Sequence, residues 1–491
     1  GDQPMLSFYI ALCHYQLKNF DPALSLADEI INNTENDETS DQESLITHDF
    51  IVEATNLKAA ILHATNQYDA AKDTMSCFHE NLDAITIHND VIINSEDDPN
   101  IAIQKIEFLL SEDISPTETL HNLLTLYTSY GQEHLAAETF KANRDLAKEV
   151  LPREVYGYFD ALQLSITSRE DAITMLEKQV TTYIPKLRSG KKNVSSAEST
   201  RPATLLRPST ASTALSRPTT ASERKTLRAV AAATSQVDAI LDNYIPTLCL
   251  QAKLYWDKED YAAAEQVLRK GAADFCTNDN DSWRNENLGH IMFAQDKFED
   301  SIQHYEMLLA LTYANEDVLE ISPVVLGNLC VCYIMTNQND EAEDIIKTVE
   351  EEEQQRAALG GADEQTNHCS SMINLVIGTL YCNRGNFDFG IDRVCKSLQP
   401  CEKNLSLDTW IYARQCFLDF ASKVSKLMVH FREDTLENIL DLLSDVESHG
   451  EHILATESKT DDESDSLNST EPETLSTQAK QLKKLYIKIC A

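Results

Sequence analysis

The chain has 491 residues, of which 42% are apolar, enough for several domains or one long repeat array. Acidic residues outnumber basic residues by 80 to 41, which gives a formal net charge of −39 and argues against binding nucleic acid through the bulk surface. No apolar run approaches the roughly 18 residues of a membrane-spanning helix, so no membrane insertion is expected. The opening residues, GDQPMLSFYI, lack an initiator methionine and a basic segment, so no signal peptide is expected.

A three-residue pattern recurs along the chain: a small residue, an aromatic residue nine positions later, and a second small residue three positions beyond that. In chain order the clear copies are Ala11–Phe20–Ala23, Ala59–Tyr68–Ala71, Ala252–Tyr261–Ala264, Gly289–Phe298–Ser301 and Gly378–Phe387–Gly390. Weaker copies are Thr125–His134–Ala137 and Cys330–Asn339–Ala342, and a degenerate unit lies around residues 83–110. The pattern predicts pairs of amphipathic helices joined by a short polar turn, in which the small residues let the two helices approach closely.

The spacing of these hairpins predicts the fold class. The step from Tyr261 to Phe298 is 37 residues, close to the 34-residue period of tetratricopeptide repeats. Longer steps predict inserted loops, which we assign to residues 32–44 and 350–365. One helix pair cannot bury both of its faces, so the pairs must stack on one another. We therefore expect an all-α tetratricopeptide-repeat superhelix, an α-solenoid without a coiled coil.

Composition divides the chain into five predicted parts. Residues 1–184 form an N-terminal repeat block, and residues 229–456 a C-terminal one. Between them lies a basic Ser/Thr/Pro-rich insert, 185–228, in which ten Lys/Arg and two Glu between Lys186 and Arg228 give a net charge of +8. Its apolar content is too low to offset the entropy of ordering, so we expect disorder. An acidic loop, 457–473, and a C-terminal closing helix, 474–491, complete the chain.

The basic insert contains three similar units in which an arginine precedes a threonine by three residues. The candidate phosphorylation sites are Thr204, Thr210 and Thr220, because this spacing suits a basophilic kinase. Phosphorylation there would cancel the positive charge of the insert. The alternative is a solvated low-complexity linker that tethers loosely to the acidic scaffold.

A search for catalytic and metal-binding motifs favours a protein that is not an enzyme. The sequence has no GxxxxGK[ST], GxGxxG or HExxH motif, and its 12 cysteines include no CxxC pair. His368 and Cys369 are adjacent, and adjacent residues do not face each other in a preorganised site. We expect no catalytic residue, no cofactor and no metal, and we interpret the cysteines as buried free thiols of a reducing compartment.

The remaining interpretation is recognition of a peptide on the inner wall of the superhelix. The first helices of the hairpins should line that wall, and aromatic or thioether groups there can hold an extended, Pro-rich peptide. The repeat phase predicts these groove residues: Tyr15, Asn56, Trp256, Phe293, Ile334, Met335, Leu375 and Thr379. An error of one residue in the phase would move each of them from the groove into the packing between repeats.

Several stretches resemble one specific family. They are ALCHYQLKNFDPAL (11–24), EATNLKAAI (53–61), YIPTLCLQAKLYW (244–256), NLCVCYIMTNQNDEAE (328–343), NLVIGTLYCNRGNFDFGI (374–391), DTWIYARQC (408–416) and QLKKLYIKI (481–489). Together they resemble the tetratricopeptide repeat protein 30 family, the long repeat subunit of the intraflagellar transport B core. The similarity runs in order along nearly the whole chain.

The resemblance implies a closed, tightly wound superhelix that encloses a Pro-rich segment of another subunit of the intraflagellar transport B core. It also implies a scaffold role in cilium assembly and in tubulin polyglutamylation, with the anterograde kinesin and tubulin-modifying machinery as further partners. The implied location is the cilium or flagellum and the basal body, with a cytoplasmic pool.

Two features depart from that family. Family members carry more repeats before the point at which MLSFYIALCHY begins here, so we expect an N-terminally incomplete chain. The family has a long helical connection where this chain has its basic insert. Two other functions stay open: a co-chaperone or adaptor that holds a peptide in its groove, and a regulatory subunit that recruits a glutamylase.

Overall fold

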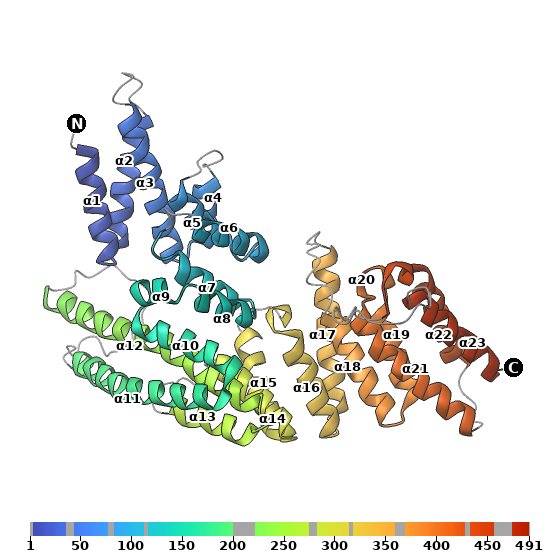
Figure 1. Cartoon of the computed structure of the whole chain (residues 1–491). Helices are drawn as coiled ribbons and strands as arrows, with labels where there is room; N and C mark the ends of the chain where they lie inside the picture. Colours follow the sequence, from blue (N-terminus) through green and yellow to red (C-terminus); the bar gives the residue numbers. More distant parts are fainter. Residues whose placement is uncertain are drawn as a thin grey trace, which may run out of the picture. The chain divides into compact units, whose positions relative to one another are not determined.

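The computed structural model describes residues 3–35, 44–76, 83–111, 116–199, 221–273, 282–313, 318–358, 369–427, 433–455 and 474–490. These residues form α-helices joined by short connections (Figure 1). The one extended pairing among them is an isolated antiparallel bridge between Leu454 and Thr474. The expectation of an all-α repeat protein is confirmed.

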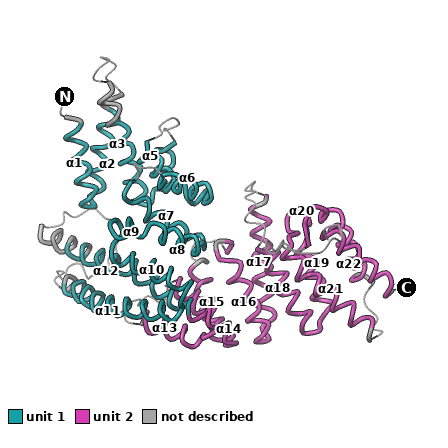
Figure 2. Tube along the Cα trace, in the orientation of Figure 1, with its two compact units in different colours: residues 1–254 teal, residues 255–491 magenta. Residues whose placement is uncertain are grey.

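The chain divides into two compact units, residues 1–254 and residues 255–491 (Figure 2). The helices that begin in the first unit are α1 (Gln3–Gln16), α2 (Phe20–Glu35), α3 (Ser44–Ala64), α4 (Tyr68–Ser76), α5 (Ala84–Ile93), α6 (Pro99–Ser111), α7 (Thr119–Ser129), α8 (Glu133–Ala142), α9 (Arg144–Val150), α10 (Arg153–Thr167), α11 (Arg169–Ser199) and α12 (Ala221–Trp256). Successive helices pack as antiparallel hairpins, among them α1 with α2, α7 with α8, and α10 with α11. The degenerate unit expected around residues 83–110 is the pair α5 and α6.

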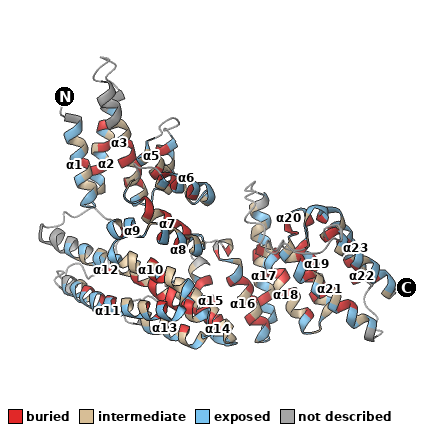
Figure 3. Cartoon of the chain, viewed as in Figure 1, coloured by how far each residue is buried: buried red, intermediate tan, exposed pale blue. Residues whose placement is uncertain are grey.

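The second unit continues the same architecture. Its helices are α13 (Tyr261–Ala273), α14 (Ser282–Ala294), α15 (Phe298–Tyr313), α16 (Pro323–Met335), α17 (Asn339–Ala358), α18 (Cys369–Asn383), α19 (Phe387–Leu398), α20 (Cys401–Asn404), α21 (Leu407–Leu427), α22 (Glu433–His449) and α23 (Leu475–Cys490), with short 3₁₀ turns at Val318–Glu320 and Gly450–His452. Buried residues gather where neighbouring helices face each other (Figure 3). A cluster around Trp410 and Phe417 closes the C-terminal end, where Tyr486 of α23 donates a hydrogen bond to the carbonyl of Phe417 at 2.6 Å.

The turns explain why the aromatic position recurs. In seven hairpins one residue adopts a positive φ, and the second helix begins two residues later. These residues are Lys18, Asn66, Gly131, Glu259, Asp296, Asn337 and Gly385. At each one the backbone N–H bonds to the carbonyl three residues back, and the next N–H bonds to the carbonyl five residues before it, as at Gly385 to Cys382 and Asn386 to Tyr381. This is the Schellman cap, which satisfies the last carbonyls of the first helix and reverses the chain.

The small residues sit where the two helices of a hairpin touch. A Cβ atom on Gly378 would lie 2.9 Å from the carbonyl oxygen of Gly390, so neither glycine leaves room for a side chain. In the hairpin of α14 and α15, Ser301 takes the second small position, and its hydroxyl donates to the carbonyl of Gly289 at 2.9 Å. The spacing of the small residues therefore follows from a steric requirement: the two helices can approach closely only where their side chains are small.

Three expectations need correction. The weak copy Thr125–His134–Ala137 is displaced by one residue, because α8 begins at Glu133 and Thr125 is exposed, whereas Leu124 and Ala136 are fully buried. The loop expected at residues 350–365 is helix as far as Ala358. The loop expected at residues 32–44 is helix to Glu35 and again from Ser44, and the residues between lie outside the described ranges.

The expected disorder of the basic insert is wrong at its flanks. Helix α11 continues to Ser199 and α12 begins at Ala221, whereas residues 200–220, with Thr204, Thr210 and Thr220, lie outside the described residues. Leu187 is fully buried, and Gly190 lies so close to Val237 that a Cβ atom would meet its methyl group at 2.7 Å. This contact orders a stretch whose own composition favours disorder. The acidic loop expected at 457–473 also lies outside the described residues.

The turns provide a first testable prediction. We expect Gly385→Ala to lower the free energy of unfolding of the second unit by about 1 kcal/mol, because alanine strains at φ 85°. Asp296→Gly should change it by less than about 1 kcal/mol, and in the stabilising direction, because it relieves the same strain at φ 58°. All three tryptophans, at 256, 283 and 410, belong to the second unit, so urea denaturation followed by tryptophan fluorescence measures both changes. A loss of stability in both variants would contradict this account of the turns.

Candidate functional site

In three hairpins of the second unit, the first helix has a row of accessible side chains along one face, at the same positions in each hairpin. On α16 the stripe is Val324, Asn328, Val331 and Met335, which follow the i, i+4, i+7, i+11 spacing of one helix face. On α18 it is Met372, Val376, Thr379 and Asn383, and each position lies 48 residues after its counterpart on α16. On α14 it is Trp283, Asn287, His290 and Ala294. We call these twelve residues the exposed stripes.

The stripes are uncharged and largely apolar. Val324 is 49% exposed and Met372 is 38% exposed, while the neighbouring positions of α16 from Val325 to Gly327 are buried. The stripes contain no Lys, Arg, Asp or Glu. At one end Arg384 donates to the carbonyl of Ile334 at 3.3 Å and to the sulfur of Met335 at 2.7 Å. An apolar surface with amide and hydroxyl groups suits a neutral extended peptide.

Two stripe residues, His290 of α14 and Asn328 of α16, are held in place by hydrogen bonds with Tyr305 of α15. The hydroxyl of Tyr305 lies 2.7 Å from Nδ1 of His290, and the amide of Asn328 donates toward the same hydroxyl at 3.4 Å. Burial lowers the pKa of His290, so the ring is neutral at neutral pH and its Nδ1 can accept a hydrogen bond from the hydroxyl of Tyr305. Burial likewise raises the pKa of Tyr305, which keeps its hydroxyl protonated as the donor. The group orients His290 and Asn328 across two neighbouring stripes.

Gly327 lies beside the α16 stripe, at a position where packing does not require a glycine. A Cβ atom built there meets no atom within 4 Å, and its φ is not positive. Glycine inside a helix costs about 0.5–1 kcal/mol relative to alanine. Gly327 therefore lowers the stability of α16, although the structure leaves space for the side chain of an alanine at this position.

The eight predicted groove residues fall into three groups. Asn56, Ile334 and Leu375 are buried; Tyr15, Phe293 and Thr379 are half-buried; Trp256 and Met335 are exposed. Only Met335 and Thr379 belong to the exposed stripes. The others have packing roles: Asn56 donates to Thr86 at 2.8 Å, Tyr15 packs on Phe20, Trp256 on Tyr261, and Phe293 on Phe298.

The displacement of Phe293, Ile334 and Leu375 is one residue in each case. Each directly precedes a stripe residue, namely Ala294, Met335 and Val376, and one residue turns a helix by about 100°. Sequence reasoning missed Val324, Asn328, Val331, Met372 and the α14 stripe. The sequence contains a signal for these positions. The first small residues of the three hairpins are Gly289, Cys330 and Gly378, and the stripe residues lie six and two positions before them and one and five positions after them.

Most of the cysteines whose side chains are described are buried. Of the nine cysteines whose side chains are described, seven are buried, Cys249 is half-buried and Cys13 is exposed, so the expectation of a buried thiol is wrong for Cys13. Burial raises the pKa of Cys369 and of Cys330 to about 12, which keeps both thiols protonated. His368 lies outside the described residues. Among the residues described, no three His, Cys, Asp or Glu side chains form a metal-binding group.

The repeated hairpins and their stripes define a helical-repeat scaffold of the tetratricopeptide class. Comparison with known sequences then identifies its family. The profile of the Intraflagellar transport protein 70 C-terminal domain matches residues 119–214 and 213–491. The chain belongs to the intraflagellar transport protein 70 family, which is the tetratricopeptide repeat protein 30 family, and the resemblance seen in the sequence is confirmed.

The relatives cover most of the chain. Intraflagellar transport protein 70A of Xenopus laevis is 36% identical over 475 residues, which span 93% of this chain and 68% of the relative. The human protein of the same name is 35% identical, with 93% and 67% covered. A solved structure of a human IFIT1 dimer with m7Gppp-AAAA is 13% identical, with 95% of this chain and 94% of that chain covered and a TM-score of 0.35. Within the described part of the chain, every helix is too short or too polar to cross a membrane.

Proposed function

We propose that this protein is a non-enzymatic scaffold subunit of the intraflagellar transport B complex that holds a Pro-rich segment of another core subunit. The observation that carries the proposal is the set of three aligned, uncharged stripes on α14, α16 and α18. A Pro-rich segment in the polyproline II conformation loses little entropy on binding, and its rings pack well on aliphatic and aromatic side chains.

The cellular part of the proposal follows the names of the relatives, which are intraflagellar transport proteins. It locates the protein in the cilium or flagellum and the basal body, with a cytoplasmic pool, and it gives the protein a role in cilium assembly. The family resemblance extends the proposal to a closed superhelix around the partner, to the anterograde kinesin and to tubulin polyglutamylation.

The charge of the stripes bears on the alternative of a co-chaperone. A groove that holds an acidic C-terminal peptide needs lysine and arginine side chains to pair with its carboxylates. The stripes have none, and the net charge of −39 repels an acidic peptide. A regulatory subunit that recruits a glutamylase stays a further candidate, because it makes no demand on the stripes.

A second prediction tests the proposed groove with one residue. The full chain is coexpressed with subunits of the intraflagellar transport B core from the same organism. We expect one of them to copurify with the parent chain through its Pro-rich segment, and Met372→Asp to lower the recovered amount at least tenfold, because the substitution puts a charge in the apolar stripe.

The matched control is Met307→Asp on α15, which is the second helix of its hairpin and carries no stripe residue. The two methionines are similarly exposed, Met307 at 42% and Met372 at 38%. The control carries the same change of charge and should leave copurification unchanged. Equal loss in both variants, or undiminished copurification of a partner that lacks its Pro-rich segment, would contradict the proposal.

A further inference from the structure

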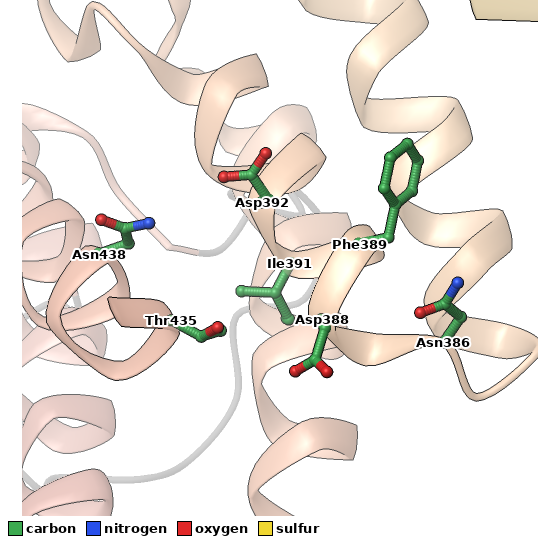
Figure 4. A pocket seen from close by; sticks show the side chains of 7 residues that line it. All are labelled: Asn386, Asp388, Phe389, Ile391, Asp392, Thr435 and Asn438. Carbon is green, nitrogen blue, oxygen red and sulfur yellow. The ribbon is translucent and has the colours of Figure 1, made fainter. Parts of the chain in front are cut away.

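A polar pocket of about 530 Å³ lies between α19 and α22 of the second unit. Its lining comes from α19 with the turn before it and from the first turns of α22 (Figure 4): Asn386, Asp388, Phe389, Ile391, Asp392, Thr435 and Asn438. Helix α19 is the second helix of its hairpin, so the pocket shares no residue with the stripes on α14, α16 and α18. The proposed function leaves it without a role.

The two helices bring four polar side chains to one place. Asp388 and Asp392 are one turn apart on α19, and Thr435 and Asn438 are one turn apart on α22. Figure 4 shows Asp388 and Asp392 on either side of Ile391, with Thr435 and Asn438 on the facing helix. Ile391 lies between the two aspartates and is fully buried in the core beneath them. The accessible side chains of the pocket are therefore mainly hydrogen-bonding groups.

The hydrogen-bonding capacity of the pocket is largely unused. Thr435 is only 8% exposed, and its hydroxyl bonds to no described residue. Asn386 precedes α19 at the position that usually caps a helix, yet its side chain makes no capping bond. Asp392 has an ion pair with Lys396 at 3.9 Å, and Asp388 has none among the residues described.

The chemistry of these groups selects a cationic side chain. Two carboxylates repel anions, and a pocket of this volume with only two carboxylates does not enclose a bare metal ion. An arginine offers five N–H donors in a planar fork, enough for Asp388, Asp392 and the oxygens of Thr435 and Asn438. A lysine has three donors on a point charge and would leave part of the pocket unsatisfied.

We propose that this pocket is a docking site for an arginine side chain of a partner protein. Charge complementarity supports this occupant, because the chain carries a net charge of −39 and attracts basic segments. The site does not depend on the Pro-rich groove, so a partner can use either surface alone.

The test uses the full chain and a small probe, N-acetyl-arginine methylamide, in saturation-transfer NMR. We expect transfer to the side-chain protons of the probe, and none above background to the citrulline analogue, which has the same shape without the charge. Asp388→Asn with Asp392→Asn should lower the transfer at least fivefold, and Thr435→Val at least twofold. The matched control, Glu437→Gln with Asp441→Asn, makes the same change of charge on exposed positions of α22 outside the pocket and should retain the transfer.

Three results would overturn the proposal: equal transfer to the arginine and citrulline compounds, equal transfer in the Asp388/Asp392 variant and the parent chain, or a rise in melting temperature with Ca²⁺ that needs both aspartates while the arginine probe does not bind. The last result would make the pocket a cation site. If the double aspartate variant has lost its helical circular dichroism, the Thr435→Val variant decides alone, because valine keeps the shape of the buried side chain.

Discussion

Replacing Gly378 with alanine is expected to lower the free energy of unfolding of the second unit by about 2–4 kcal/mol. The added Cβ atom would lie 2.7 Å from a methyl group of Val394, and 2.9 Å from both the carbonyl oxygen of Gly390 and the backbone nitrogen of Val394. A side chain can rotate away, but the two backbone atoms move only if α18 and α19 separate. Separation would open the contact on which Ile377 and Ile391, both almost fully buried, depend.

The control for this prediction is Gly327→Ala on α16. It also replaces a glycine inside a first helix of the same unit, but the added Cβ atom meets nothing within 4 Å. Alanine favours the helix, so we expect a gain of about 0.5–1 kcal/mol. Urea denaturation followed by tryptophan fluorescence measures both variants. Two changes of the same sign, or a loss below about 0.5 kcal/mol for Gly378→Ala, would show that close approach does not hold this hairpin together.

The opposite expectations for two glycines show what the sequence can predict. Gly378, Phe387 and Gly390 lie within one hairpin, so the steric rule that links them acts over a few residues and appears as a fixed spacing. The same holds for the turns, where the residue two positions before the aromatic adopts positive φ. Fold class, hairpin positions and most first and second helices were therefore predictable from local patterns.

The direction in which a helix faces was harder to predict. On α16, Ile334 and Met335 are both apolar, and nothing in their composition shows that the first is buried and the second exposed. That outcome depends on α14 and α18, which lie on either side. A prediction based on the first small residue of each hairpin, rather than on residue type, would have kept Met335, left out Ile334 and added Val324.

Long-range contacts explain the remaining errors. The glutamates after Val349 look like a solvated loop, yet Glu352 accepts a hydrogen bond from the backbone of Val318, and Glu353 from that of Ser370, each at 3.0 Å. These bonds tie the helix α17 to the starts of its neighbours. The polar pocket has the same origin, since Asp388 and Thr435 are far apart in the sequence and no local pattern relates them.

The second large effect is expected at Arg393, a charged residue inside the second unit. Its side chain is 8% exposed and donates to Glu343 at 2.6 Å and to Asn374 at 3.0 Å. The guanidinium also lies 5.0 Å from the ring centroid of Phe389. One residue therefore joins α17, α18 and α19 through charge, hydrogen bonds and ring stacking.

We expect Arg393→Met to lower the free energy of unfolding of this unit by about 2–4 kcal/mol. Methionine fills a similar volume, so the loss reflects the groups left behind rather than a cavity. Breaking a fully buried pair costs about 3–5 kcal/mol, and the expectation here is lower because Glu343 keeps 35% of its side chain exposed and can regain water. The side-chain oxygen of Asn374 is buried, so it cannot bond to water once the hydrogen bond from Arg393 is lost.

A second substitution separates these contributions. Adding Glu343→Gln to Arg393→Met removes the stranded carboxylate charge and should recover about 1 kcal/mol, whereas Lys396→Met on the exposed side of α19 should change stability by less than about 0.5 kcal/mol. Tryptophan fluorescence in urea, at low and high salt, measures all three variants. If Arg393→Met costs no more than Lys396→Met, Arg393 does not act as a link between α17, α18 and α19. The stability of these hairpins would then come from the apolar contacts alone.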